Sequence, residues 1–132
     1  MREDGYAEVL RFRRELRSFL RWSEQAARDA GLTPAVHQLL LAVRGSSRDG
    51  GPTVGDVAAE LGVRHHSAVE LTQRAEDLGL LLRDRSGEDQ RQVRLSLTRT
   101  GQERLEQLTT LHLPRIEQLA DALADVTAVR FG

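Results

Sequence analysis

The apolar residues of the first thirty positions recur with the period of an α-helix. Within the stretch from Tyr6 to Ala30 they stand at steps of three, four and three, at Val9, Phe12, Leu16 and Phe19. This spacing places them on one face of a helix, and Gly31 ends the pattern. The sequence therefore predicts a long amphipathic helix whose apolar stripe needs a partner.

Caps mark the starts of the next two helices. Thr33 and Pro34 are typical of an N-cap followed by the first helical position. They predict a helix that stops at the glycine-rich loop 45–52. Thr53 and Asp56 have the spacing of a capping box, in which each side chain bonds the other residue's backbone. A second short helix is therefore expected directly after this loop.

The helix after Thr53 is expected over about 54–61, and Gly62 separates it from another that starts at Arg64 or His65. Val63 is expected to return to the core. The later helix ends near position 78, and its inward face carries Ala68, Leu71, Thr72 and Ala75. Two helices joined by a tight turn containing glycine form a helix-turn-helix.

Two short strands are expected after this motif. Residues 80–82 are leucines, and residues 93–97 alternate with period two. The segment between them, centred on Gly87, is polar and forms an exposed hairpin tip. A hairpin directly after a helix-turn-helix defines a winged helix.

From Thr100 the chain returns to helix, with Pro114 as either a kink or the first residue of a new helix. The expected fold class is mainly α with a small β-hairpin wing. It comprises an N-terminal helix over 1–30, a winged helix-turn-helix lobe over 31–98 and C-terminal helices over 99–132, in one integrated domain.

Composition removes several classes of function. The 132 residues, 39% of them hydrophobic, suffice for one domain. The absence of cysteine excludes disulfides, thiolate zinc sites and cysteine nucleophiles. No signal-peptide core or membrane-length apolar run is present, so a cytoplasmic protein is expected. No catalytic set or phosphate loop is recognisable, and neither an enzyme nor a cofactor is expected.

The charge balance limits how nucleic acid can be bound. Net charge is -1 at pH 7, so any face that binds DNA must be a local one. Every cationic side chain is arginine, and arginine forms bidentate contacts with phosphate and guanine.

Several short motifs stand in a fixed order along the chain. They are Leu32-Thr33-Pro34 with His37, Val57-Ala58, Leu61-Gly62-Val63, the run from Arg64 to Leu71, Gly79-Leu80-Leu81, Asp89-Gln90-Arg91, Val93, Leu97-Thr98 and Gly101. Together they resemble the MarR (multiple antibiotic resistance regulator) family over nearly the whole chain. The most specific part is the Asp-x-Arg wing tip that leads to Leu-Thr-x-x-Gly.

The resemblance implies a dimer joined by its terminal helices, with the second helix of each helix-turn-helix in a major groove and each wing near a minor groove. Many relatives are repressors, and some are released by phenolic or other anionic ligands, which leaves a small-molecule effector open. The expected function is thus a sequence-specific transcriptional regulator that binds a pseudo-palindromic operator in double-stranded DNA as a homodimer. The alternative is a winged helix that binds only proteins, and salt-dependent binding to duplex DNA would separate the two.

The expected DNA-reading face lies opposite the apolar face of the second helix. It carries His65, His66, Ser67, Val69, Glu70, Gln73 and Arg74, with Arg64 and the wing-tip Arg91 added for phosphate or minor-groove contact. Asp89 is expected to hold the wing in shape. Glu70 departs from many relatives, and either accepts from cytosine N4 or opposes phosphate.

Three further features have competing interpretations. His66 and Glu70 have the i, i+4 spacing of metal ligands, but no third ligand is near in sequence and no metal is expected. His37 is expected to make a partly buried polar contact. His112 either lines a pocket beneath the dimer arms or caps a helix end.

Dimerisation is expected to use one apolar stripe at each end of the chain, because neither has an obvious partner within the winged-helix lobe. The stripes are Val9, Phe12, Leu16 and Phe19, and Ile116, Leu119, Leu123 and Val126. The two helices also carry opposite charges, so charge pairs between them would steer the register. The first has Arg11, Arg13, Arg14, Arg17 and Arg21 against Glu15, and the last has Glu117, Asp121 and Asp125.

Overall fold

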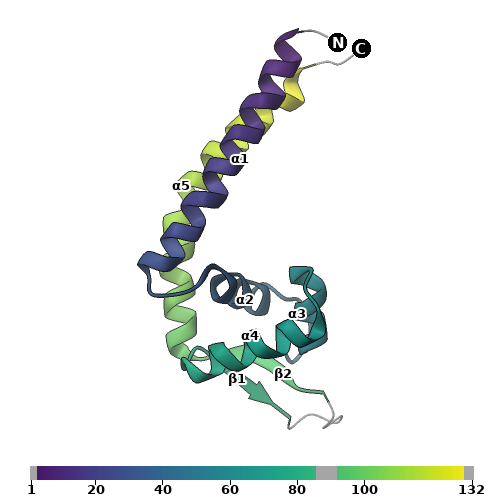
Figure 1. The fold of residues 1–132 in the computed structure, drawn as a ribbon, viewed down its shortest axis with the longest axis vertical. Coiled ribbons are helices and arrows are strands. Elements are labelled where there is room, and N and C mark those ends of the chain that lie inside the picture. Colours follow the sequence, from purple (N-terminus) through teal and green to yellow (C-terminus); the bar gives the residue numbers. More distant parts are fainter. Residues whose placement is uncertain (1–2, 86–91, 130–132) are drawn as a thin grey trace.

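The computed structural model describes residues 3–85 and 92–129, and in these ranges it is mainly helical with one antiparallel strand pair. The elements are α1 (Glu3–Asp29), α2 (Pro34–Arg44), α3 (Val54–Leu61), α4 (His65–Asp77), β1 (Leu81–Asp84), β2 (Arg94–Leu97) and α5 (Arg99–Ala128). Helices α1 and α5 run antiparallel as a long arm, and the other elements form a lobe at one end of it (Figure 1). The predicted fold class is confirmed. Within these ranges no helix has the length and apolar character needed to cross a membrane.

The predicted caps are present. The Val36 amide donates to Thr33 Oγ1 at 3.2 Å, and Pro34 opens α2. At the start of α3 the Asp56 amide donates to Thr53 Oγ1 at 3.1 Å, and the Thr53 amide donates to Asp56 Oδ2 at 2.9 Å. Two bonds from the Arg48 guanidinium, and then the Thr53 amide, lower the pKa of Asp56 to about 2. The capping box is thus also the anchor of loop 45–52.

Helix α2 joins the lobe to the arm because it is apolar on two faces. Val36 and Leu40 are fully buried in a cluster with residues of α5, such as Leu108. Leu39 is buried in a second cluster with α3, α4 and the two strands, where Leu95 of β2 packs. The first cluster therefore fixes α2 against α5, and the second fixes it within the lobe.

The Leu-Thr-x-x-Gly motif has a structural role at the start of α5. The Thr98 hydroxyl accepts from the Gly101 amide at 3.0 Å and donates to the Gly79 carbonyl at 2.6 Å. Gly101 is buried, and a Cβ there would collide with the Leu80 carbonyl oxygen. Because the backbones of Gly101 and Leu80 are in contact, the motif holds the start of α5 against the winged helix. Its role is therefore structural.

Gly101→Ala is expected to lower the free energy of unfolding by about 1–3 kcal/mol, since backbone must move to admit the methyl group. Urea unfolding followed by circular dichroism measures this. The control is Gly55→Ala in α3, where the added Cβ meets only Thr53 Oγ1 at 3.7 Å. The control should be neutral or stabilising because alanine has the higher helix propensity. Equal stability of the two variants would contradict the close packing at Gly101.

The structure corrects the prediction for Val63 and decides between the two alternatives for Pro114. Val63 does not return to the core, and is 40% exposed. Its amide instead donates to the Ala58 carbonyl at 3.0 Å, after Gly62 in the left-handed region, and so completes a helix C-cap. Pro114 does not begin a new helix: α5 is one helix from Arg99 to Ala128. The break in its hydrogen bonding that Pro114 causes is tolerated within the long helix.

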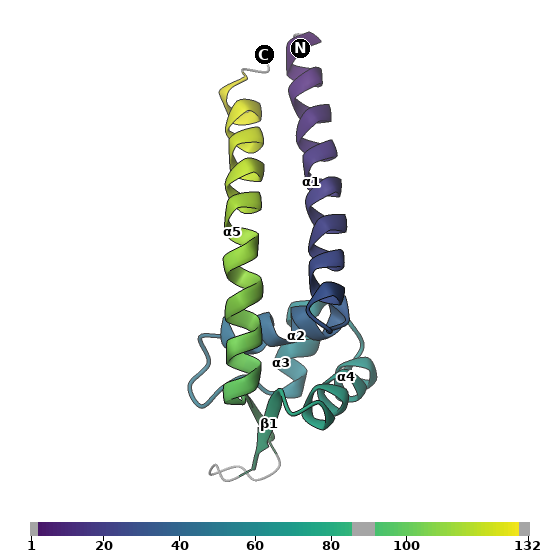
Figure 2. The same cartoon turned by 90° about the vertical axis from the view of Figure 1, so that its left-hand side faces the viewer.

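The two terminal stripes face each other within the chain, because α1 packs along α5 (Figure 2), and their role in dimerisation stays a prediction. Half-buried members of the stripes are Phe12, Leu16, Phe19, Leu119 and Val126. The Arg11 guanidinium also pairs with the Asp125 carboxylate inside the chain. Val9, Ile116 and Leu123 stay exposed, at 36%, 45% and 46%.

Candidate nucleic-acid interface

Helix α4 is held by one buried face. Ala68, Thr72 and Ala75 are fully buried, and the Thr72 hydroxyl donates to the Ala68 carbonyl at 2.6 Å. Because that bond satisfies the hydroxyl within its own helix, threonine is tolerated in the core. The left-handed Gly62, with φ of 66°, makes the tight turn from α3 into α4. These constraints fix which side of α4 faces outward.

The outward side of α4 brings the predicted reading residues together. All of those in the described residues are exposed, namely Arg64, His65, His66, Ser67, Val69, Glu70, Gln73 and Arg74. The face and the β1–β2 hairpin both lie at the end of the lobe remote from the tip of the arm (Figure 1). A surface of this kind, with donors, acceptors and one apolar side chain on a protruding helix, suits the edges of bases in a major groove.

Two arginines of this face carry free positive charge. Neither Arg64 nor Arg74 has an ion pair within the described ranges 3–85 and 92–129. Arg64 is the N-cap residue of α4 and makes no side-chain cap bond. Local charge of this kind is what a chain of net charge -1 needs in order to contact phosphate.

His66 and Glu70 form a pair on the exposed face. His66 Nε2 lies 3.1 Å from Glu70 Oε1, and both side chains are largely exposed. Among the described residues no third histidine or carboxylate joins them in a group that could hold a metal ion. The pair therefore places a ring nitrogen and a carboxylate side by side on this face.

Gln73 is tied to the wing by a residue that the sequence interpretation missed. Arg83 Nη2 of β1 donates to Gln73 Oε1 at 3.1 Å, and Gln73 Nε2 donates to Asp77 Oδ1 at 3.0 Å. Arg83 Nε also lies 3.6 Å from Glu76 Oε2. The signal was the period of two in the strand, which puts Arg83 on the same side as the buried Leu81.

The base of the wing is anchored to the lobe. Arg94 Nη1 donates to the Gly51 carbonyl at 3.0 Å, and the Leu95 amide donates to the Pro52 carbonyl at 2.9 Å. Asp89 and Arg91, the predicted tip residues, lie outside the described residues, so their roles stay predictions.

A buried histidine pair lies where the arm meets the lobe. The rings of His37 and His112 are 5.1 Å apart between centroids, and each residue is 7% exposed. His112 Nε2 lies 2.6 Å from Ser23 Oγ and its Nδ1 lies 2.7 Å from the Leu108 carbonyl. His112 does not cap a helix end, because α5 continues past it to Ala128. His37, expected to be partly buried, is almost fully buried, with its ring against His112.

The protein is expected to become less stable as the pH is lowered, and His37 is the cause. Burial, and then the charge of His112, lowers the pKa of His37 from its usual 6.5. The unfolded chain therefore takes up a proton more readily than the folded one, and the free energy of unfolding decreases as pH falls below about 6.5. Urea unfolding at about pH 7.5 and about pH 5.5 measures this decrease. The loss of stability between the two pH values should be smaller in His37→Gln. The control is His65→Gln, which replaces an exposed histidine and should show the same loss as the wild type. A loss in His37→Gln as large as that of the wild type would show that His37 is not the cause.

With this geometry established, comparison with known proteins identifies the fold. A family model described as the MarR family matches residues 30–92, from the end of α1 to the wing. The winged helix of this chain is thus similar to that of the MarR family. Members of the MarR family are transcription regulators, and the matched segment of this chain contains the α3–α4 pair. Comparison with curated proteins gives no significant match.

Solved MarR-family structures share the fold of this chain. The S. aureus MepR–DNA complex is 20% identical with a TM-score of 0.70, and the match covers 86% of this chain and 82% of that one. Apo MarR from E. coli is 20% identical with a TM-score of 0.71, covering 88% of each chain. Bordetella bronchiseptica BpsR is 23% identical with a TM-score of 0.60, covering 83% and 74%. The likeness extends beyond the family match to the long terminal helices.

Proposed function

We propose that this chain is a sequence-specific DNA-binding transcription regulator, a repressor, that binds a pseudo-palindromic operator as a homodimer. The observation that carries the proposal is the exposed polar face of α4, held rigidly by Ala68, Thr72 and Ala75 and placed beside the hairpin of a MarR-family winged helix. The MepR structure with DNA supports it, because that relative has the same fold.

In this proposal the residues of the interface divide by chemistry. Arg64 and Arg74 contact phosphate, and so fix the position of α4 without reading sequence. Ser67, Gln73 and Glu70 read donor and acceptor groups in the major groove, and Val69 contacts a thymine methyl group. His65 and His66 also offer ring nitrogens to this groove. Arg91 would enter the minor groove, with Asp89 supporting the wing.

The homodimer is proposed from the apolar surface that α1 and α5 leave uncovered. Large exposed side chains on these helices are Tyr6, Val9, Leu10, Leu20, Leu111, Leu113, Ile116 and Leu123. On α5, Leu113, Ile116 and Leu123 recur at steps of three and seven, the spacing of a helix–helix seam. A second copy related by a two-fold axis would cover this seam and set two α4 helices roughly 34 Å apart.

A small-molecule effector that releases the operator is part of the proposal. Its support is BpsR, a protein of similar fold whose DNA binding is regulated by 6-hydroxynicotinic acid. The chain shares the fold of that protein but only 23% of its residues, so the chemistry of an effector must come from this chain's own surface.

Gln73→Ala is expected to reduce preference for the operator over random duplex by about 1–3 kcal/mol, with little change in non-specific affinity. The variant also loses the bonds to Arg83 and Asp77. Asp77→Ala is the control for that loss, since it frees Gln73 without removing its amide. Fluorescence anisotropy on both duplexes measures the preference. If Gln73→Ala loses equal affinity for the operator and for random duplex, Gln73 does not read a base. Ser67→Ala is expected to show the same loss of preference as Gln73→Ala.

The function itself is tested by selecting bound sequences from a pool of random duplexes. A regulator of the proposed kind enriches an inverted repeat, and binding to the enriched duplex weakens steeply with salt. A winged helix that binds only proteins enriches no sequence. That outcome would refute the proposed function.

A further inference from the structure

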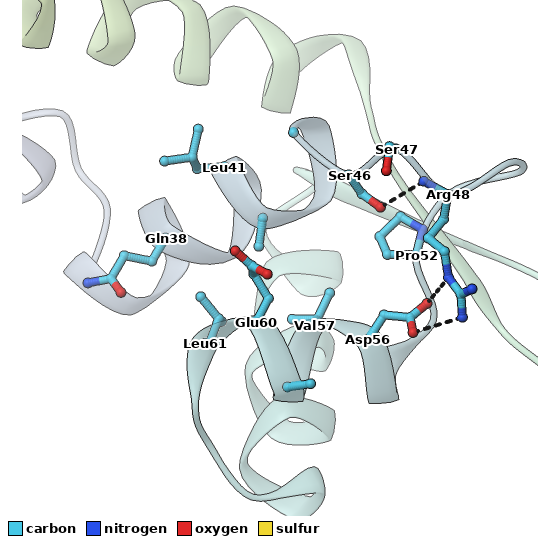
Figure 3. A pocket seen from close by; sticks show the side chains of 13 residues that line it. Gln38, Leu41, Ser46, Ser47, Arg48, Pro52, Asp56, Val57, Glu60 and Leu61 are labelled. Atoms are coloured by element: carbon cyan, nitrogen blue, oxygen red, sulfur yellow. Dashed lines mark hydrogen bonds and ion pairs between the residues drawn. The ribbon is translucent and has the colours of Figure 1, made fainter.

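A hollow of about 710 Å³ opens between α2, α3 and loop 45–52 (Figure 3). Its volume lies within the range of about 300–1,000 Å³ typical of small-molecule sites. None of the exposed residues of α4 lines it. The hollow is therefore separate from the candidate DNA interface, and nothing in the proposed function assigns it a role.

The walls of the hollow are largely apolar. They include Leu41 and Ala42 from α2, Pro52 from the loop, and Val57 and Leu61 from α3. Leu41 is 52% exposed, whereas Leu39 and Leu40 of the same helix are fully buried. An apolar group seated here would remove the Leu41 side chain from water, which is favourable.

The charges of the lining leave one carboxylate without a partner. The charged lining residues are Arg48, Asp56 and Glu60, which give a net charge of -1. Arg48 and Asp56 neutralise each other through two bonds of 3.1 Å. Within the described part of the chain Glu60 has no ion pair or hydrogen bond from its side chain. Figure 3 shows its carboxylate between α2 and α3, close to the apolar wall.

We infer that this hollow binds a small organic cation that has an apolar body and a protonated amine. The amine donates to Glu60, while the body packs on Leu41 and Leu61. A carboxylate ligand is disfavoured because the Arg48 charge is already matched by Asp56. None of the lining residues is aromatic, so a quaternary ammonium would find no π face, and an N–H donor is required.

The test uses 2-phenylethylamine as the probe and ¹⁵N-labelled full-length protein without DNA. Titration at neutral pH is expected to shift amide signals of α2 and α3, with a dissociation constant in the millimolar range. Glu60→Gln should weaken binding by about tenfold, the effect of losing one charge-assisted hydrogen bond. The control Glu24→Gln, an exposed carboxylate of α1, should bind as the wild type does.

Two analogues test the chemical class. Trimethyl(2-phenylethyl)ammonium keeps the charge and loses the N–H donors, and 3-phenylpropionate reverses the charge; both should bind more weakly. The inference is overturned if Glu60→Gln binds the amine unchanged, if the shifted amides lie away from α2 and α3, if 3-phenylpropionate binds equally well, or if no shift occurs at millimolar amine. Because no DNA is present, these outcomes are independent of the proposed function.

Discussion

Replacing both Ile116 and Leu123 by aspartate is expected to give a folded monomer that binds the operator at least about a hundredfold more weakly. Both side chains are already 45–46% exposed in the single chain, so the change does not disturb a core. In the dimer the same positions would be covered, and four buried carboxylates at one seam would oppose association. Each monomer would then bind only one half-site and lose the gain that comes from joining two.

Multi-angle light scattering measures the mass of the variant, and anisotropy on the operator duplex measures its affinity. The matched control is Gln107→Asp with Gln118→Asp. Both residues are exposed on α5, and neither lies on the helix face that carries Leu113, Ile116 and Leu123. The control should remain dimeric and bind normally. Circular dichroism should show the same helical content in all three proteins. A dimer that survives the Ile116 and Leu123 changes would place the interface elsewhere.

Arg74→Ala is expected to be the second large effect, and its signature is a change in salt dependence. Arg74 is exposed on α4 and has no ion pair in the described residues, so its charge is available for phosphate. A dimer loses two such contacts when the residue is replaced. The slope of log affinity against log salt should therefore become shallower by about 2, and affinity should fall about equally on operator and random duplex.

Arg28→Ala is the control for net charge, because Arg28 is an exposed arginine near the end of α1, outside the α4 face. It should leave the slope unchanged. If Arg74→Ala lowers affinity for the operator only, Arg74 reads a base and does not hold phosphate. If the slope of Arg74→Ala equals that of the wild type, the residue does not contact DNA.

The winged-helix lobe was largely predictable because its signals are local. The Thr33–Pro34 start and the Thr53–Asp56 capping box act within one helical turn, and both appear in the structure as expected. The inward face of α4 follows from spacing alone, and Ala68, Thr72 and Ala75 are buried. Once those three point inward, helical geometry places the other predicted residues of α4 outside.

What the sequence did not reveal depends on contacts between distant segments. The apolar stripe of α1 signalled a need for a partner but not whether α5 of the same chain or of another copy supplies it. Opposite charges on the two terminal helices predicted pairing between them, as Arg11 and Asp125 show, but they could not say that both partners belong to one chain. The bond from Arg83 to Gln73 likewise needs the position of β1 beside α4. Pro114 was ambiguous because proline interrupts one hydrogen bond whether a helix continues or ends.

In the proposed complex a rigid dimer of winged helices binds duplex DNA through two α4 helices. Affinity for duplexes in which the two halves of the selected repeat are moved apart tests it most directly. The account predicts tightest binding when the half-site centres are about 10 base pairs apart. Insertion of about five base pairs, half a helical turn, should place one half-site on the opposite side of the duplex and abolish the gain from dimerisation. Equal affinity at every spacing, measured at one salt concentration, would contradict it.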